Sequence, residues 1–187
     1  MKPIIIEYKK EHDLREKMLL WLLGNVVEVH ARAYSGRKPW GLKREDLLTF
    51  APGTLGNELG HFLQREDLQP VDKIERHDAF HILLDYSTQL SDEAAMQYYL
   101  IANGKKSPFT VATALFTGMV MPDYWSKFYK EYKRGRRARS IARWDFKELL
   151  DEPYTDIKKV INFEPVNNHR LMKKIEGFEL MEQATFF

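Results

Sequence analysis

The sequence predicts an all-α fold, a single-domain helical bundle that spans residues 1–187. Two observations indicate this class. Apolar residues recur at helical spacings along most of the chain, and no alternation of polar and apolar residues lasts long enough for a strand. The 187 residues contain no internal repeat and no break in composition, which suits one domain with one sizeable core.

Most of the expected helices are delimited by their own boundary residues. Thr54 caps a helix after a Pro-Gly turn, Ser91 caps a helix that Gly104 ends, and Pro108 and Pro122 each precede a helix. The helix at 109–121 is apolar on nearly every side, which predicts that it is buried. The expected helices cover residues 14–33, 55–63, 71–86, 91–103, 109–121, 122–140, 144–150, 153–161 and 169–181.

Composition and charge exclude several classes of site and partner. The absence of cysteine excludes disulfides and thiolate metal sites, and it is compatible with a reducing compartment. The formal net charge of +2 selects no partner, and we expect no nucleic acid. The apolar run at 3–6 is shorter than a signal peptide needs, and the stretch at 107–122 is shorter than the about 20 residues of a spanning helix. We therefore expect a cytoplasmic protein.

The stretch HDAFHILLDYSTQLSDE, residues 77–93, combines polar and apolar residues in an unusual way. A helix turns by about 100° per residue, so Asp78, His81 and Asp85 lie about 100°, 40° and 80° from His77 around its axis. The other positions are mostly apolar, so this helix is expected to be buried with its polar arc facing the interior. Histidines at i and i+4 can offer two nitrogens to one metal ion, whereas Asp85 is expected to cap or to pair.

Glu93 can join the two histidines only if the chain reverses. Twelve residues of straight helix would place it about 18 Å from His81, while a ligand atom lies about 2 Å from its metal. Residues 86–91 contain Ser, Thr and Gln and end at the expected cap Ser91, so we expect a turn that returns Glu93 toward the pair. The alternative for His77 and His81 is a hydrogen-bonded pair in the core.

The spacing H-D-x-x-H-x(11)-E resembles the signature of the ubiquinone (coenzyme Q) biosynthesis Coq-four family, and it is formed here by His77, Asp78, His81 and Glu93. The sequences PGTLG at 52–56, GRRA at 135–138, and Trp144 with the Leu- and Pro-containing segment at 149–157 are similar to further patterns of that family. The resemblance covers residues 45–161 and leaves 163–187 as a C-terminal extension. Asp92 is a departure, because a glycine often precedes the glutamate in the family.

The resemblance implies a divalent metal ion bound by His77, Asp78, His81 and Glu93. Two histidines with one carboxylate suit iron(II), and the same set suits zinc. Asp78 and Glu93 are the expected catalytic residues, with Asp78 either a fourth ligand or an acceptor that orients a histidine ring. The implied reaction is metal-dependent oxidative decarboxylation of a polyprenylated aromatic acid, in which a hydroxyl group replaces the ring carboxyl group.

The resemblance also implies partners. Members of the family have been regarded as organisers of a biosynthetic complex at the membrane face. We therefore expect a peripheral protein at the inner membrane face, with a prenylated aromatic or isoprenoid lipid and other quinone-biosynthesis proteins as partners. A non-enzymatic isoprenoid-lipid-binding scaffold is accordingly an alternative function. The long apolar part of the first expected helix, residues 14–29, predicts a homodimer.

A second alternative function is an HD-type metal-dependent phosphohydrolase. In that class a histidine, a His-Asp pair and a later aspartate form the site, and His61, His77, Asp78 and Asp123 follow this order. This pattern is less specific than the first, and it leaves His81 and Glu93 without a role.

Two other stretches leave alternatives open. Residues 133–143 contain six basic residues and no acidic one, which indicates either a solvated helix face or a surface for anionic lipids or a prenyl-phosphate-like group. The helix at 109–121 is either part of the core or, through its small residues Ala112, Ala114 and Gly118, the wall of a tunnel for an isoprenoid chain.

Overall fold

The computed structural model describes residues 38–105 and 107–184, and within them the fold is all-α, as the sequence predicts. The helix expected at 14–33, and the homodimer expected from it, lie outside the described residues. The described part contains no strand, only an isolated bridge between Thr54 and Pro153. Its helices are α2 (Arg44–Leu48), α3 (Leu55–Arg65), α4 (Glu75–Leu84), α5 (Leu90–Ala102), α6 (Pro108–Val120), η1 (Pro122–Tyr124), α7 (Trp125–Arg137), η2 (Phe146–Leu149), α8 (Tyr154–Ile161) and α9 (His169–Ala184).

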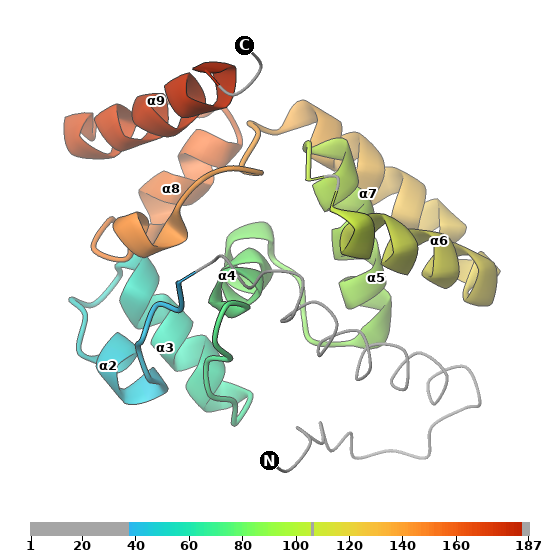
Figure 1. The fold of residues 1–187 in the computed structure, drawn as a ribbon, viewed down its shortest axis with the longest axis horizontal. Helices are drawn as coiled ribbons and strands as arrows, with labels where there is room; N and C mark the ends of the chain where they lie inside the picture. The colour runs from blue at the N-terminus through green and yellow to red at the C-terminus, as the bar shows by residue number, and fades with distance from the viewer. Residues whose placement is uncertain (1–37, 106, 185–187) are drawn as a thin grey trace.

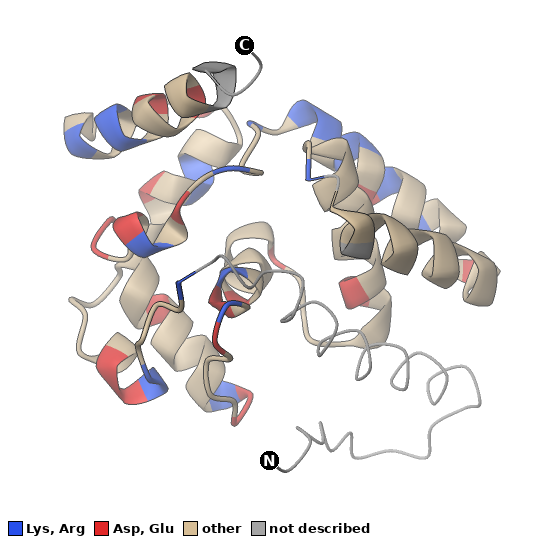
Figure 2. Ribbon diagram, viewed as in Figure 1, with Lys and Arg blue, Asp and Glu red and all other residues tan. Residues whose placement is uncertain are grey.

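The helix α4 lies in the middle of the molecule (Figure 1). In this view α2 and α3 lie to the left of α4, and α5, α6 and α7 lie to its right. The helices α8 and α9 lie above α2 and α3. Figure 2 shows charged residues on most of the helices, with the basic ones gathered toward the end of α7. None of the described helices combines the length and the apolar character needed to cross a membrane.

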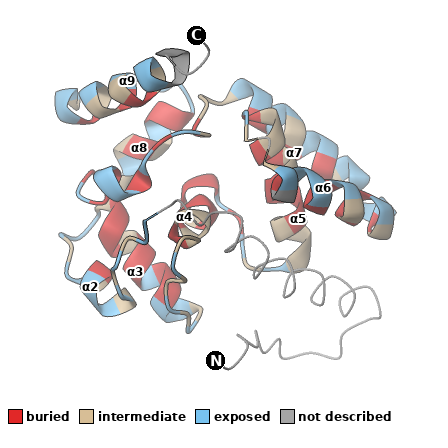
Figure 3. Cartoon of the chain, viewed as in Figure 1, coloured by how far each residue is buried: buried red, intermediate tan, exposed pale blue. Residues whose placement is uncertain are grey.

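The motif-bearing helix α4 is buried, as predicted (Figure 3). Ala79, Phe80, Leu83 and Leu84 are all at most 3% exposed, because neighbouring elements pack on most sides of the helix. The Phe80 ring, for example, meets the Phe146 ring edge-on at 5.5 Å between centroids. A helix surrounded in this way holds its polar side chains in fixed positions inside the protein.

The PGTLG turn is joined to the segment that precedes α8. The Leu55 amide donates to the Glu152 carbonyl at 2.9 Å, and the Tyr154 amide donates to the Gly53 carbonyl at 2.9 Å. The Tyr154 hydroxyl then donates to the Ile82 carbonyl of α4 at 2.6 Å. Two of the patterns that flank the histidine motif in sequence therefore meet in space and support α4.

Small residues allow α5 to pack closely against α6 and α7. A Cβ atom at Gly135 would collide with the backbone carbonyl of Tyr99, and one at Gly118 would collide with the Tyr98 hydroxyl. The same hydroxyl donates to the Ala114 carbonyl at 2.7 Å. Ala114 and Gly118 thus serve helix packing, and Ala112 is exposed, so these contacts do not support a tunnel along α6.

The prediction that the apolar helix at 109–121 is buried is wrong for one of its faces. Leu115 is 65% exposed and Met119 is 73% exposed, with Val111 beside them at 36%. The helix packs through Ala114 and Gly118 onto α5, and its opposite face is left open. Because that open face carries no polar residue, the sequence pattern could not distinguish it from a buried one.

The remaining differences from the sequence prediction concern one helix boundary and one short helix. The expected helix at 122–140 is the 3₁₀ turn η1 followed by α7, which ends at Arg137. The helix α2 was not predicted, since its five residues are too few to show a period. The extension contributes to the core through Leu171, Ile175 and Phe178 of α9.

Substituting Gly135 by alanine is expected to lower the free energy of unfolding by about 1–3 kcal/mol, because the added Cβ meets the Tyr99 carbonyl. Gly177→Ala is the matched control, since a Cβ there meets nothing within 4 Å. That control should be more stable than the wild type by about 0.5–1 kcal/mol, as alanine favours a helix. Urea unfolding of both variants measures the difference, and equal effects would contradict the packing described.

Candidate metal centre

The turn between α4 and α5 brings His77, His81 and Glu93 together. His81 Nε2 lies 2.9 Å from Glu93 Oε1, and His77 Nε2 lies 3.3 Å from Glu93 Oε2. One potential ligand atom from each of the three lies within 4.8 Å of the others. The predicted reversal of the chain is therefore confirmed, and we call these three residues the His–Glu cluster.

The spacing of the His–Glu cluster fits a metal ion. Two ligand atoms that each lie about 2.1 Å from a metal, at tetrahedral or octahedral angles, are about 3.0–3.4 Å apart. The two histidine-to-carboxylate separations, 2.9 Å to Oε1 and 3.3 Å to Oε2 of Glu93, are close to that range, and they are also the distances of hydrogen-bonded ion pairs. Two imidazoles and one carboxylate are the donor set of zinc sites and of non-haem iron(II) sites, and both leave positions for further ligands.

Two local features produce the turn between α4 and α5. Asp85 adopts the left-handed conformation, with φ 59° and ψ 46°, and ends α4, after which the Tyr86 amide donates to the His81 carbonyl at 2.9 Å. The Asp92 carboxylate then accepts hydrogen bonds from the Ser87 amide, at 3.1 Å, and from the Ser87 hydroxyl. Asp85 also pairs with Lys158, so its predicted role as a cap and ion-pair partner is confirmed.

The expected cap at Ser91 is wrong. The helix α5 begins at Leu90 with Gln89 as its N-cap residue, and Gln89 makes no capping hydrogen bond through its side chain. The Asp92 carboxylate in the first turn of α5 instead reaches back beyond the helix to Ser87, and it also pairs with Lys127. This aspartate, a departure from the family pattern, is thus the residue that closes the turn.

The His81 ring is held in one orientation from two sides. Its Nδ1 lies 3.2 Å from the Tyr86 carbonyl oxygen. Because a carbonyl can only accept, Nδ1 carries the proton and Nε2 is the atom that faces Glu93. The Phe62 ring stacks on His81 with 5.6 Å between centroids, and His81 is only 3% exposed.

Asp78 lies beside His77 rather than with the other carboxylate. Its Oδ1 is 3.9 Å from His77 Nδ1, on the side of the ring away from the nitrogen that faces Glu93. A carboxylate that orients a metal-bound histidine lies on this side of the ring, but it does so at hydrogen-bond distance, which 3.9 Å exceeds. The role of Asp78 in metal binding or catalysis stays a prediction.

The charges in the His–Glu cluster shift the pKa values of its members. Burial alone would lower the pKa of His77, but the Glu93 and Asp78 carboxylates outweigh it and raise that pKa to about 10. Burial alone would raise the pKa of Glu93, but His77 and His81 hold it well below its ordinary value. A carboxylate that stays ionised inside a protein requires a cation, either a proton on the imidazoles or a metal ion.

A second layer of contacts supports the turn. The Tyr86 hydroxyl donates to Glu131 Oε2 at 2.7 Å, and Glu131 also pairs with Arg134 at 3.1 Å. Arg134 in turn donates to the Leu84 carbonyl at 2.6 Å, near the end of α4. The helix α7 therefore fixes the residue whose carbonyl orients His81.

Sequence reasoning missed several residues around the cluster. Phe62 and Glu131 lie on other helices, and no spacing in the sequence relates them to the motif. Gln97 could have been found, because it follows Glu93 by four residues and so shares its helix face. It is 2% exposed, and its side-chain oxygen has no hydrogen-bond partner in the described part of the chain.

The residues of the HD-type alternative do not assemble. His61 is exposed on α3, and Asp123 is exposed in η1. Within residues 38–105 and 107–184, the potential metal-binding group consists of His77, His81 and Glu93 and contains neither of them. No observation favours phosphohydrolase activity.

The sequence matches no protein-family model, and no curated protein matches it. Among solved structures, the fold is similar to a crystal structure from Nostoc punctiforme, of a protein provisionally named as a ubiquinone biosynthesis protein. The TM-score is 0.54, and the similarity covers 81% of this chain and 83% of that chain at 17% sequence identity. At this identity the likeness establishes a shared fold.

Metal affinity is expected to increase with pH. His77 has a pKa of about 10 in the metal-free protein, so it is protonated at neutral pH and has to lose that proton to bind a metal. The apparent affinity for zinc should therefore rise about tenfold per unit between about pH 6 and about pH 9. Competition titrations with a chelator of known affinity measure this slope, and a flat profile would contradict the protonated state of His77.

Asp92→Ala should weaken zinc binding by about tenfold, since outer contacts of this kind typically contribute that much to metal affinity. The reason is that Glu93 is no longer held by the closed turn. Asp85→Asn is the matched control: it removes a charge from the same turn, and asparagine tolerates the left-handed conformation. Equal loss in both variants would show that the charge of the turn, and not its closure, determines affinity.

Proposed function

We propose that this chain is a metal-dependent enzyme of quinone biosynthesis, and that it catalyses oxidative decarboxylation of a polyprenylated aromatic acid. The observation that carries the proposal is the convergence of His77, His81 and Glu93, with ligand spacing, at the turn between α4 and α5. The motif resemblance to the Coq-four family and the fold shared with the Nostoc punctiforme protein both support quinone biosynthesis as the context.

The His–Glu cluster holds a divalent metal, zinc or iron(II), whose chemistry would be to polarise the carboxyl or phenolic oxygen of the substrate. In the reaction the ring would lose its carboxyl group as carbon dioxide and gain a hydroxyl group at the same carbon. Water would supply the hydroxyl oxygen, and dioxygen would take up the two electrons and leave as hydrogen peroxide. Phe62 and the Tyr86 carbonyl keep His81 Nε2 directed at the metal site. His77 and Glu93 are partly exposed and provide access from solvent, while the Asp78 carboxylate lies 3.9 Å from His77 Nδ1 and adds negative charge on that side of the ring.

A groove beside the cluster suits an aromatic substrate. It has a volume of about 430 Å³ and reaches His81, and its walls include the rings of Phe62, Tyr86 and Tyr154. Arg65 stands at this groove, with its guanidinium 5.7 Å from the centre of the Phe62 ring. Arg65 pairs with Glu66 at 3.5 Å, and Glu58, Glu66 and Asp85 also line the groove. We infer that the ring of the substrate stacks against the aromatic walls of the groove.

The second candidate is a non-enzymatic scaffold that binds isoprenoid lipid at a membrane face. The observation that favours it is the exposed apolar face of α6, which continues into α7 through Trp125 and Tyr129, each 62% exposed. The Trp125 indole donates to the Gly118 carbonyl at 2.6 Å and so joins the two helices. Aromatic and apolar side chains of this kind suit the boundary between lipid and water.

Metal content and turnover distinguish these functions. Purified protein should contain about one metal ion per chain, and His77→Ala/His81→Ala should contain none, while His61→Ala should retain both metal and activity. Glu93→Gln should abolish carbon dioxide release from a prenylated hydroxybenzoate while the far-ultraviolet circular dichroism is unchanged. If the wild-type protein binds no metal under any condition, the enzyme proposal is wrong. If turnover survives in Glu93→Gln, Glu93 is not a functional residue.

A further inference from the structure

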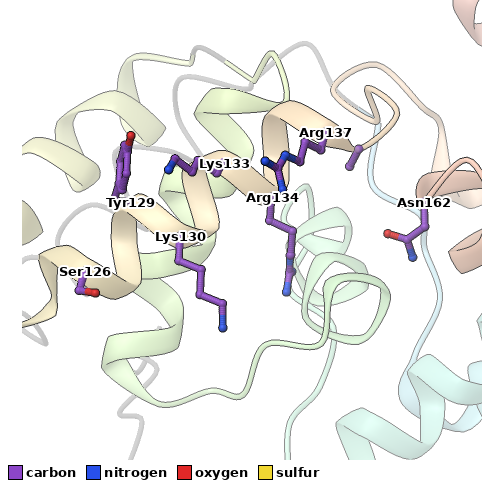
Figure 4. A pocket seen from close by; sticks show the side chains of 8 residues that line it. Ser126, Tyr129, Lys130, Lys133, Arg134, Arg137 and Asn162 are labelled. Carbon is purple, nitrogen blue, oxygen red and sulfur yellow. The ribbon is translucent and has the colours of Figure 1, made fainter.

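A basic cleft opens on the molecule away from the His–Glu cluster. It has a volume of about 610 Å³ and lies between α7 and the end of α8. Figure 4 shows Lys130 and Arg134 extending from α7 into it, with Asn162 on the opposite side. None of the lining residues belongs to the His–Glu cluster, and they are Ser126, Tyr129, Lys130, Lys133, Arg134, Arg137, Ala138 and Asn162.

The positive charge of this basic cleft is largely unneutralised. No acidic residue is among those that line it. Arg134 pairs with Glu131, but Lys130, Lys133 and Arg137 form no ion pair with any acidic group in the described part of the chain. The Lys133 ammonium lies instead over the Tyr129 ring, 4.3 Å from its centre. Water and salt screen part of the repulsion between these exposed like charges, and an anion bound between them would neutralise the remainder.

The helix period places these cations on one face. Relative to Lys130, residues 133, 134 and 137 lie within an arc of about 100°. A solvated helix usually spreads its charges or mixes both signs, and basic residues near a C-terminus often stabilise the free carbonyls there. Here the side-chain amide of Asn103 donates to the Gly135 carbonyl in the last turn of α7 at 3.2 Å, and to the Arg139 carbonyl just beyond the helix at 2.9 Å. Part of this stabilisation therefore comes from Asn103 and not from the basic side chains.

The far wall of the cleft is fixed relative to α7. The Arg139 amide donates to the Ile161 carbonyl at 2.8 Å, which joins the end of α7 to the end of α8. Asn162 follows directly, and its side-chain amide donates to the Lys158 carbonyl at 3.0 Å. A concave surface between two connected helices offers a ligand contacts from both sides, as a convex helix face does not.

We propose that the basic cleft is a second ligand site, which binds two or more phosphate groups at the same time. Lys130 and Arg137 are separated by about 10 Å along the helix axis, further than one phosphate group reaches. Ammonium and guanidinium groups form strong charge-assisted hydrogen bonds with phosphate oxygens. Ser126, Tyr129 and Asn162 add neutral polar groups at the margin. The phosphate groups come either from a soluble polyphosphate or from lipid headgroups.

Isothermal titration calorimetry with tripolyphosphate tests the soluble source. We expect saturable binding of one tripolyphosphate per chain and at least tenfold weaker binding of orthophosphate. Lys130→Glu/Arg137→Glu should weaken the binding by about a hundredfold, about tenfold for each lost charge-assisted contact. Arg136→Glu/Lys173→Glu is the control, since it changes net charge equally at exposed residues that do not line the cleft. Arg134 is left intact because it also supports α4.

Two further experiments identify the source of the phosphate groups and distinguish the basic cleft from the His–Glu cluster. Co-sedimentation with vesicles of equal parts phosphatidylglycerol and phosphatidylcholine tests the headgroup source, and vesicle binding without tripolyphosphate binding would assign it. Affinity retained in His77→Ala/His81→Ala would show that the anion does not bind at the metal centre. The proposal is overturned if neither probe binds, if affinity disappears in that histidine variant, or if both charge-reversal variants weaken binding equally.

Discussion

The reversal of the chain between α4 and α5 is the constraint on which the candidate site depends. Without it, Glu93 would lie more than three helical turns from His81, and the two side chains could not bind the same metal ion. The reversal needs a left-handed residue, which Asp85 provides, and a side chain that closes the turn, which Asp92 provides. The Tyr86 carbonyl within the same turn then orients His81, so chain direction and ring orientation are set together.

The position of α4 explains why these polar groups need one another. The two imidazoles of α4 and the Glu93 carboxylate of α5, which the turn brings against them, lose much of their hydration. That loss is costly unless a cation compensates for it. In the metal-free protein the proton on His77 provides part of this compensation. A divalent ion would provide more, since its larger charge replaces protons that repel one another. Glu131 and Arg134 of α7 stabilise the turn from outside and leave the donor atoms free.

Much of this arrangement could be predicted from the sequence, and the remainder has identifiable reasons. The burial of α4 followed from its apolar circumference, and the turn followed from the polar residues at 86–91. The closing role of Asp92 could not be predicted, because an aspartate in a first helical turn is equally typical of a dipole effect. The exposed face of α6 was missed because its apolar side chains resemble a core, and Glu131 was missed because it lies among solvated charges on α7.

The measurement that tests the central claim most directly is X-ray absorption at the metal edge of protein loaded with zinc or iron(II). If the His–Glu cluster is the metal centre, the fine structure should contain two imidazole nitrogens and one carboxylate oxygen at about 2.0–2.2 Å from the metal. The imidazole scattering should be lost when His77 and His81 are both replaced by alanine. A spectrum that shows oxygen ligands alone, or one that this double substitution leaves unchanged, would contradict the account.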